Sequence, residues 1–242
     1  MTVQRLNNRD HAALRVRQDV SEYENSIYCP IVLPEFRRLQ SCYPLVFTRP
    51  SDGSAYQPVA LLGLQADENL FVDEGAWKSP HIPLLIERGP FLIGTAAKVN
   101  NDGSGENFVA INSEHKAVNS TEGERLFNED GSNTEYLNHL SDILKLIHSG
   151  IQTTTEFVNA LTTYELITPL TLRVPLSRGN AAEVTGLYAI DEERVRSASE
   201  NVLMLLHNNN WLMPIYMMIA SLAQVTHLAD RKNQRISGKT KS

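Results

Sequence analysis

Apolar residues in the first half of the chain come in short runs that are bounded by turn residues. The runs lie at 43–48, 59–64, 70–72, 91–97 and 108–111. Runs of this length between turns are typical of β-strands, and short strands with tight turns favour an antiparallel sheet. Leu33-Pro34-Glu35 predicts a brief helix among them, because proline suits the first turn of a helix.

In the second half, apolar residues recur every three or four positions, as they do on the buried face of a helix. The first such stripe consists of Leu137, Leu140, Leu144 and Ile147. Ser132 and Glu135 predict a capping box at the start of this helix, and Gly150 predicts its end. Thr153 and Glu156 predict a second capping box, which would start a new helix.

Strand-like and helical patterns alternate once more toward the C-terminus. Residues 170–176 alternate between apolar and polar side chains, and a further apolar run covers 184–190. Asp191 is placed to cap a helix that the asparagines at 208–210 would end. An apolar helix through Leu228 then closes the fold.

These patterns predict an α+β fold, in which an antiparallel sheet of short strands from the N-terminal half packs with a mainly helical C-terminal half. No linker rich in proline, glycine or serine and no internal repeat divides the sequence. We predict an N-terminal arm at 1–20, a single domain at 21–230 and a basic flexible tail at 231–242. A domain boundary near residue 130 is the alternative.

Composition and charge narrow the class of protein. Of the 242 residues, 42% are hydrophobic and 21% are charged, which excludes a collagen-like or largely disordered chain. The net charge of −6 argues against general nucleic-acid binding by the body of the protein. The last twelve residues hold five basic side chains and no acid. They predict a helix end followed by a solvated tail, and a contact with an anionic partner is the alternative.

Neither end of the chain predicts a membrane protein. Residues 1–20 contain no continuous apolar stretch that could act as an export signal, so we expect a cytoplasmic protein, with a non-standard export route left open. The most apolar stretch, Trp211–Ala223, has thirteen residues and includes Pro214. Its helix would rise only about 20 Å, short of the ~30 Å core of a bilayer. We therefore expect a buried core helix and no membrane insertion.

Motifs for nucleophilic, nucleotide-binding or metal chemistry do not occur in the sequence. It has no GxSxG, Walker A, GxGxxG or CxxC pattern, and Cys29 and Cys42 are predicted to be free, packed thiols. Glu135, His139 and Asp142 share one helix face, but we expect that face to be solvated because the leucine stripe is the buried one. No catalytic residue, metal or cofactor is predicted.

The loop at 100–106 places oxygen side chains at alternating positions, as a calcium-binding loop does. Ile111 stands where such a loop needs a bidentate glutamate, so we expect an ordinary loop.

Segment 69–91 has an unusual density of rigid and aromatic residues. It holds three prolines, a tryptophan and a neighbouring pair of opposite charges. One interpretation is a concave recognition surface, for which the candidate binding residues are Asn69, Asp73, Trp77, His81, Glu87, Arg88 and Phe91. The other interpretation is a proline-ordered loop that packs Trp77 and Phe91 against the sheet.

Five blocks of sequence resemble the bacterial SapC-like family. In chain order they are PVALLGLQADENLFVDEGAW, IPLLIERGPFLIG, GERLF, GLYAIDEERV and WLMPIYMMIASLAQVTHLADRKN. The resemblance spans roughly residues 20–233, nearly the whole chain. The chain departs from the family pattern at His81, where an aromatic residue is common, and at Gly89, where a larger residue often stands. Residues 111–118 lack the Asp and Pro-Arg often seen before the GxxLF block.

The resemblance implies a supporting biological role and no particular chemical reaction. The family is named for a surface-layer-associated protein, and no general catalytic activity is established for it. Its members are often encoded near TonB-dependent receptors and near halogenase-like and cupin-like proteins, which implies a supporting role in nutrient acquisition or modification. The like-named peptide-transporter permease is a different protein.

We therefore expect a soluble, non-enzymatic binding or assembly protein whose partner is a protein or a small molecule. We expect no specific nucleic-acid partner and leave a homo-oligomer open. The alternative is an accessory enzyme or cofactor-dependent modifier that acts with halogenase-like or cupin-like proteins. A structural component of a surface layer is the third hypothesis, and it requires ordered self-assembly.

Overall fold

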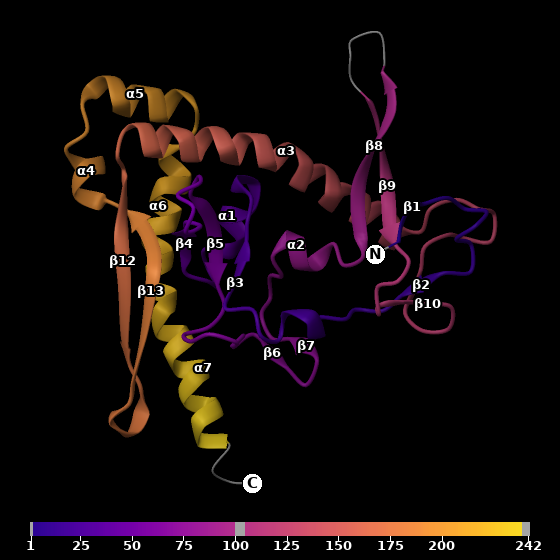
Figure 1. The fold of residues 1–242 in the computed structure, drawn as a ribbon, viewed down its shortest axis with the longest axis horizontal. Coiled ribbons are helices and arrows are strands. Elements are labelled where there is room, and N and C mark those ends of the chain that lie inside the picture. Colours follow the sequence, from indigo (N-terminus) through magenta and orange to yellow (C-terminus); the bar gives the residue numbers. More distant parts are fainter. Residues whose placement is uncertain (1, 100–104, 239–242) are drawn as a thin grey trace. The chain divides into compact units, whose positions relative to one another are not determined.

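The structure is a computed structural model that describes residues 2–99 and 105–238 (Figure 1). The chain divides into two compact units, and each is built from two separate stretches of sequence. Unit 1 comprises Met1–Asp19 and Leu84–Ser149, and unit 2 comprises Val20–Pro83 and Gly150–Ser242. The single domain at 21–230 and the N-terminal arm stay predictions.

Unit 1 contains two small antiparallel sheets. In the first, β9 (Gly105–Asn112) lies between β1 (Val3–Arg5) and β8 (Phe91–Val99), with Phe91 opposite Ile111. This pairing confirms the two strands predicted at 91–97 and 108–111. In the second, β2 (Arg15–Val16) lies between β10 (Val118–Asn119) and β11 (Glu124–Arg125). Helix α2 (Leu84–Glu87) also belongs to this unit.

Unit 2 is built around a five-stranded antiparallel sheet. The strand order is β12 (Ile167–Pro175), β13 (Ala181–Ile190), β4 (Leu45–Thr48), β5 (Gln57–Leu61) and β3 (Tyr28–Pro30). The predicted α+β class is thus confirmed, although two strands of the largest sheet come from the second half of the sequence. A short ribbon, β6 (Val72–Asp73) and β7 (Ala76–Trp77), lies beyond β5 in the chain.

Short helical turns connect these strands. They are η1 (Ser21–Tyr23), η2 (Leu33–Glu35), α1 (Phe36–Leu39) and η3 (Ser177–Gly179). The brief helix predicted from Leu33-Pro34-Glu35 is therefore confirmed. Its proline stands in the first turn, where the missing N–H has no helical partner to lose.

Helix α3 (Glu135–Thr163) is one continuous helix of 29 residues, so the predicted break at Gly150 is wrong. Its start also differs from the prediction. Thr134 Oγ1, rather than a Ser132–Glu135 box, accepts the hydrogen bond from the Leu137 N–H at 3.3 Å. The Ser132 hydroxyl instead donates to Asp130, which lowers the pKa of that carboxyl.

Gly150 has a packing role inside the helix. A Cβ built on it would lie 2.9 Å from Val32 Cβ and 3.1 Å from Pro34 Cδ, closer than real carbon atoms approach. The residue is therefore small because another backbone passes close by, rather than because the helix ends. The second capping box is wrong for the same reason, since Thr153 lies within a helix that is already formed.

The remaining helices are α4 (Glu192–Arg196), α5 (Glu200–Asn208), α6 (Leu212–Ser221), η4 (Leu222–Gln224) and α7 (Val225–Gly238). Asp191 caps α4 as predicted, because its side chain accepts from the Arg194 N–H at 3.0 Å. The single helix predicted from Asp191 to the asparagines is wrong, because α4 ends at Arg196 and α5 begins at Glu200. Residues 231–238 of the predicted tail form the last turns of α7. Residues 239–242, like 100–104 of the loop with calcium-type spacing, lie outside the described residues.

The C-terminal helical run buries one side and exposes the other. Ile215, Met218 and Leu228 are buried, whereas Met213 and Tyr216 are exposed. By length and composition alone, Leu212–Ser237 could cross a membrane, and 28% of its most apolar window is buried. This is a weak indication that does not decide the environment of the helix.

Candidate binding groove

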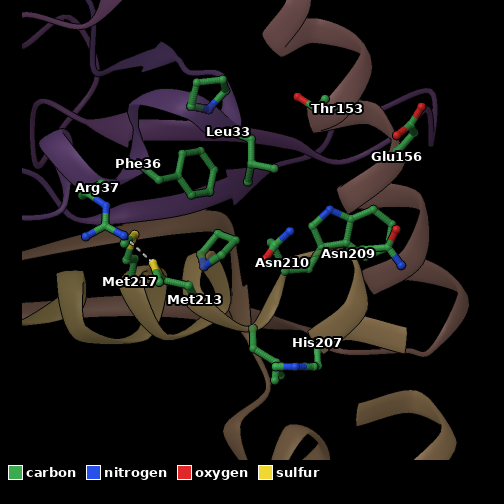
Figure 2. A pocket seen from close by; sticks show the side chains of 14 residues that line it. Leu33, Phe36, Arg37, Thr153, Glu156, His207, Asn209, Asn210, Met213 and Met217 are labelled. Atoms are coloured by element: carbon green, nitrogen blue, oxygen red, sulfur yellow. Dashed lines mark hydrogen bonds between the residues drawn. The ribbon is translucent and has the colours of Figure 1, made fainter. Parts of the chain in front are cut away.

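A groove of about 740 Å³ lies within unit 2 (Figure 2). We call it the α1–α6 groove, because its lining comes from η2 and α1, from the second half of α3, and from the joint between α5 and α6. Its lining residues are Leu33, Pro34, Phe36, Arg37, Thr153, Glu156, His207, Asn209, Asn210, Trp211, Leu212, Met213, Pro214 and Met217. Three chain segments that are distant in sequence therefore build one site.

The η2 wall of the groove is held to α3 by hydrogen bonds. The Glu35 side chain is buried, and it accepts from the Val32 N–H at 2.9 Å. The next N–H along the chain, that of Leu33, donates to Thr154 Oγ1 at 2.8 Å. The Thr154 hydroxyl in turn donates to the Gly150 carbonyl at 2.5 Å. These three hydrogen bonds satisfy buried polar groups of the turn and hold it against α3.

An aromatic row forms the floor behind this wall. Phe36 and Phe157 pack edge to face with ring centroids 6.2 Å apart, and Phe157 and Trp211 do so at 6.3 Å. Phe36 and Phe157 are almost fully buried, whereas Trp211 is half-buried. Trp211 is therefore the member of the row with exposed ring surface beside the groove.

The α5–α6 joint places Trp211 in this row. Asn210 has a φ of +59°, a conformation that asparagine tolerates better than most residues. Its N–H donates to the His207 carbonyl at 2.9 Å, and the Trp211 N–H donates to the Leu206 carbonyl at 2.8 Å. The predicted helix end at the asparagines is confirmed, and the turn aims the tryptophan back at α3.

Polar and charged groups stand at the two ends of the groove. Figure 2 shows Arg37 with Met213 and Met217 at one end, and Thr153 and Glu156 toward the other. Arg37 Nη2 donates to Met213 Sδ at 2.7 Å, and a thioether sulfur is a weak acceptor. The guanidinium therefore has most of its hydrogen-bonding capacity left for a stronger acceptor.

Sequence comparison identifies the family of this chain. The SapC family profile matches residues 6–228 of the 242. The chain belongs to the SapC family. No curated protein and no solved structure matches the chain.

In this SapC-family chain, the candidate residues of segment 69–91 divide between the two units. Asn69, Asp73, Trp77 and His81 belong to unit 2, whereas Glu87, Arg88 and Phe91 belong to unit 1. Asn69 is buried, and its Nδ2 donates to the Tyr23 carbonyl at 2.9 Å. Asp73 is exposed at the end of β6.

Trp77 and His81 make internal contacts with Tyr43. The Trp77 indole lies 6.1 Å from the Phe71 ring at 15°, and its Nε1 donates to the Tyr43 hydroxyl at 2.9 Å. The Tyr43 hydroxyl donates to the His81 carbonyl. Burial raises the pKa of the Tyr43 phenol above its ordinary value. These contacts favour the packed-loop interpretation for Trp77, and its part in binding stays a prediction.

The three candidates in unit 1 also have partners. The Glu87 carboxylate lies 3.1 Å from His139 Nε2, Arg88 Nη1 donates to the Phe91 carbonyl at 2.7 Å, and Phe91 is fully buried. Asp142 pairs with Lys145 at 2.9 Å, so the His139 and Asp142 side chains of the possible metal face are engaged elsewhere. Within residues 2–99 and 105–238, no group of three or more His, Cys, Asp or Glu could hold a metal ion.

A second hollow, of about 650 Å³, is lined by Asn69 and Asp73 together with part of α7. Here Lys232 forms an ion pair with Glu68, and the Arg235 guanidinium donates to the Val72 carbonyl. Arg231 lies 4.4 Å from the centre of the Phe71 ring. The cations at 231–235, which the sequence assigned to the tail, thus attach α7 to segment 68–72.

Proposed function

We propose that this SapC-family chain is a non-enzymatic binding protein whose α1–α6 groove receives the apolar part of a ligand. The observation that carries the proposal is the volume of about 740 Å³ with an aromatic and methionine-rich lining. Ligand sites typically have roughly 300–1,000 Å³, apolar walls and a few polar groups that fix orientation. Methionine adds adaptability, because its unbranched side chain adjusts to different shapes.

The charged end of the groove indicates the class of ligand. Among the described residues, the Met213 sulfur is the one hydrogen-bond acceptor of the Arg37 side chain. A carboxylate, sulfonate or phosphate oxygen would replace it with a stronger, charge-assisted hydrogen bond. An aromatic or aliphatic body would meanwhile cover Trp211 and Met217. The proposed ligand is therefore an apolar small molecule with an anionic end.

The test uses Trp211 as the reporter. In a Trp77→Phe chain, Trp211 is the only tryptophan, because the sequence has two. The probe is anilinonaphthalene sulfonate, which has an apolar body and an anionic group. We expect it to bind with energy transfer from Trp211, and we expect Arg37→Gln to weaken binding about tenfold.

A pair of threonine-to-phenylalanine variants, one inside and one outside the groove, shows whether the probe binds in the groove. Thr153 lines the groove and Thr155 does not, yet both are exposed on α3 and bond a carbonyl of the preceding turn. Thr153→Phe should therefore reduce probe affinity at least tenfold, and Thr155→Phe should leave it within twofold. Equal affinities in the two variants would overturn the proposal. Native mass spectrometry of the purified full chain would then show whether any small molecule is retained elsewhere.

A further inference from the structure

The outer side of α6 carries an apolar stripe that is open to solvent. The stripe, which we call the α6 stripe, consists of Met213, Tyr216 and Ala220 of α6 and of Ala223 in the following turn η4, all of which are exposed. Met213 is 53% exposed and Tyr216 57%, which is unusual for such large apolar side chains. The spacing of three, four and three residues is the spacing of the seam that packs one helix on another in a coiled coil.

The opposite side of the same helix is already occupied. Ile215 and Met218 are buried, and the Ser221 hydroxyl accepts from the Leu45 N–H of β4 at 2.8 Å. Contacts with β4 and β13 fix this side on the sheet. The orientation of α6 is therefore set, and the exposed stripe is not a helix face that can turn inward.

We propose that the α6 stripe pairs with the α6 stripe of a second copy of the chain, in antiparallel orientation about a two-fold axis near residue 218. In this register Met213 lies opposite the partner's Ala223, and Tyr216 lies opposite the partner's Ala220. Each large side chain thus faces a small one, which lets two helices approach closely and interdigitate. A shift by one helical turn in either direction would lose this match at one of the two pairs.

Charge and polarity agree with self-pairing. Residues 211–229 contain no Asp, Glu, Lys or Arg, so no like charges meet when the same surface is used by both copies. Two copies of this uncharged surface can therefore meet without electrostatic repulsion between the paired segments.

The size of the stripe determines how strongly we expect two copies to associate. From Met213 to Ala223 the helix rises about 15 Å, and four side chains cover less than the ~800 Å² that each partner of a standard interface contributes. We therefore expect a weak dimer that forms at micromolar concentrations and dissociates on dilution.

Sedimentation equilibrium of the full chain over a wide concentration range tests the dimer. Ala220→Glu places a charge opposite the partner's Tyr216 and should raise the dissociation constant at least tenfold. Ala181→Glu makes the same exchange at an exposed alanine of β13 and should leave it within twofold. Because both positions are exposed, circular dichroism should report the same fold. Equal association of the two variants would overturn the proposal.

Cross-linking tests the register. In a Cys42→Ser background, Met213→Cys combined with Ala223→Cys should give a covalent dimer on oxidation. Either single variant should not, because equal positions of antiparallel helices would lie about 15 Å apart and a disulfide needs Cα atoms within about 7 Å. Efficient cross-linking of the single variants would overturn the antiparallel arrangement.

Other occupants of the stripe give different results. A chain that stays monomeric at every concentration overturns the dimer. If that monomer floats with phosphatidylcholine vesicles and Ala220→Glu does not, the stripe binds a lipid surface instead. Met213 belongs to both the groove lining and the stripe, whereas Ala220 belongs to the stripe and does not line the groove. The probe titration repeated in Ala220→Glu should therefore be unchanged. Loss of probe binding in Ala220→Glu would show that the groove binds the probe only in the dimer, and would overturn binding by a single copy.

Discussion

Gly150 lies inside helix α3, where a glycine ordinarily lowers stability. Replacing it with alanine in an open position would recover about 1 kcal/mol of helix propensity. At this position the new Cβ would lie 2.9 Å from Val32 Cβ, 3.0 Å from Val32 Cγ2 and 3.1 Å from Pro34 Cδ. A β-branched side chain and a proline ring cannot swing aside, so the η2 turn must move away from α3.

The clash should outweigh the gain in propensity. Overpacking by one methyl group typically costs about 1–3 kcal/mol, and the movement also lengthens the bond from the Leu33 N–H to Thr154 Oγ1, now 2.8 Å. We therefore expect Gly150→Ala to lower the free energy of unfolding by roughly 1 kcal/mol. For a chain of this size, that corresponds to a fall in Tm of about 2–4 °C.

Urea unfolding followed by circular dichroism measures this change. Ser149→Ala is the matched control, because Ser149 is the exposed neighbour of Gly150 in the same helix, and its effect should stay within about 0.5 kcal/mol. A Gly150→Ala protein that is more stable than the wild type by about 1 kcal/mol would refute the close packing of η2 on α3. The groove wall derived from that packing would then be wrong too.

Two further predictions concern buried polar groups of unit 2. Lys232→Met removes the cation beside Glu68, whose carboxylate is largely buried, and should lower the free energy of unfolding by about 3–5 kcal/mol. Adding Glu68→Gln should restore part of that loss in urea unfolding, and an unchanged midpoint for Lys232→Met alone would contradict the ion pair. Because burial raises the pKa of Tyr43 above the ordinary 10.0, the folded state keeps a proton that the unfolded state releases. The stability of the wild type should therefore be complete below pH 10 and fall above it by up to about 1.4 kcal/mol per pH unit, whereas equal slopes for wild type and Tyr43→Phe would refute this.

Local sequence patterns were sufficient for the longer strands and helices, whereas the short strands β1, β2, β3, β10 and β11 were not predicted. The strands β4, β5, β8 and β9 could be predicted because each is an apolar run between turn residues, and the cap at Asp191 depends only on its own helix. The placement of β12 and β13 at the edge of β4 could not be predicted. Strand pairing depends on contacts between distant segments, which periodicity along one strand does not encode.

Gly150 and Trp77 show how tertiary contacts change the meaning of a residue. A glycine after a leucine stripe is a common helix end, but here it allows the approach of Val32 from a segment more than a hundred residues away. Trp77 and its prolines indicated a recognition surface by their chemistry alone. The structure places the Trp77 indole on Phe71 and against the Tyr43 hydroxyl, so much of that chemistry is used internally.

The apolar helix after residue 211 was predicted to be buried, but the structure exposes one of its sides. A helix without charges is expected in a buried core, and composition cannot distinguish it from a helix that docks on one side and exposes the other. Packing decides the matter, because the sheet takes up Ile215 and Met218 and leaves Met213 and Tyr216 in solvent. The fold buries one side of the helix and leaves apolar side chains exposed on the other, where we propose that binding occurs. The groove and the stripe therefore both depend on the orientation of α6 on the sheet. The sequence alone does not predict that orientation, because it depends on contacts with distant strands.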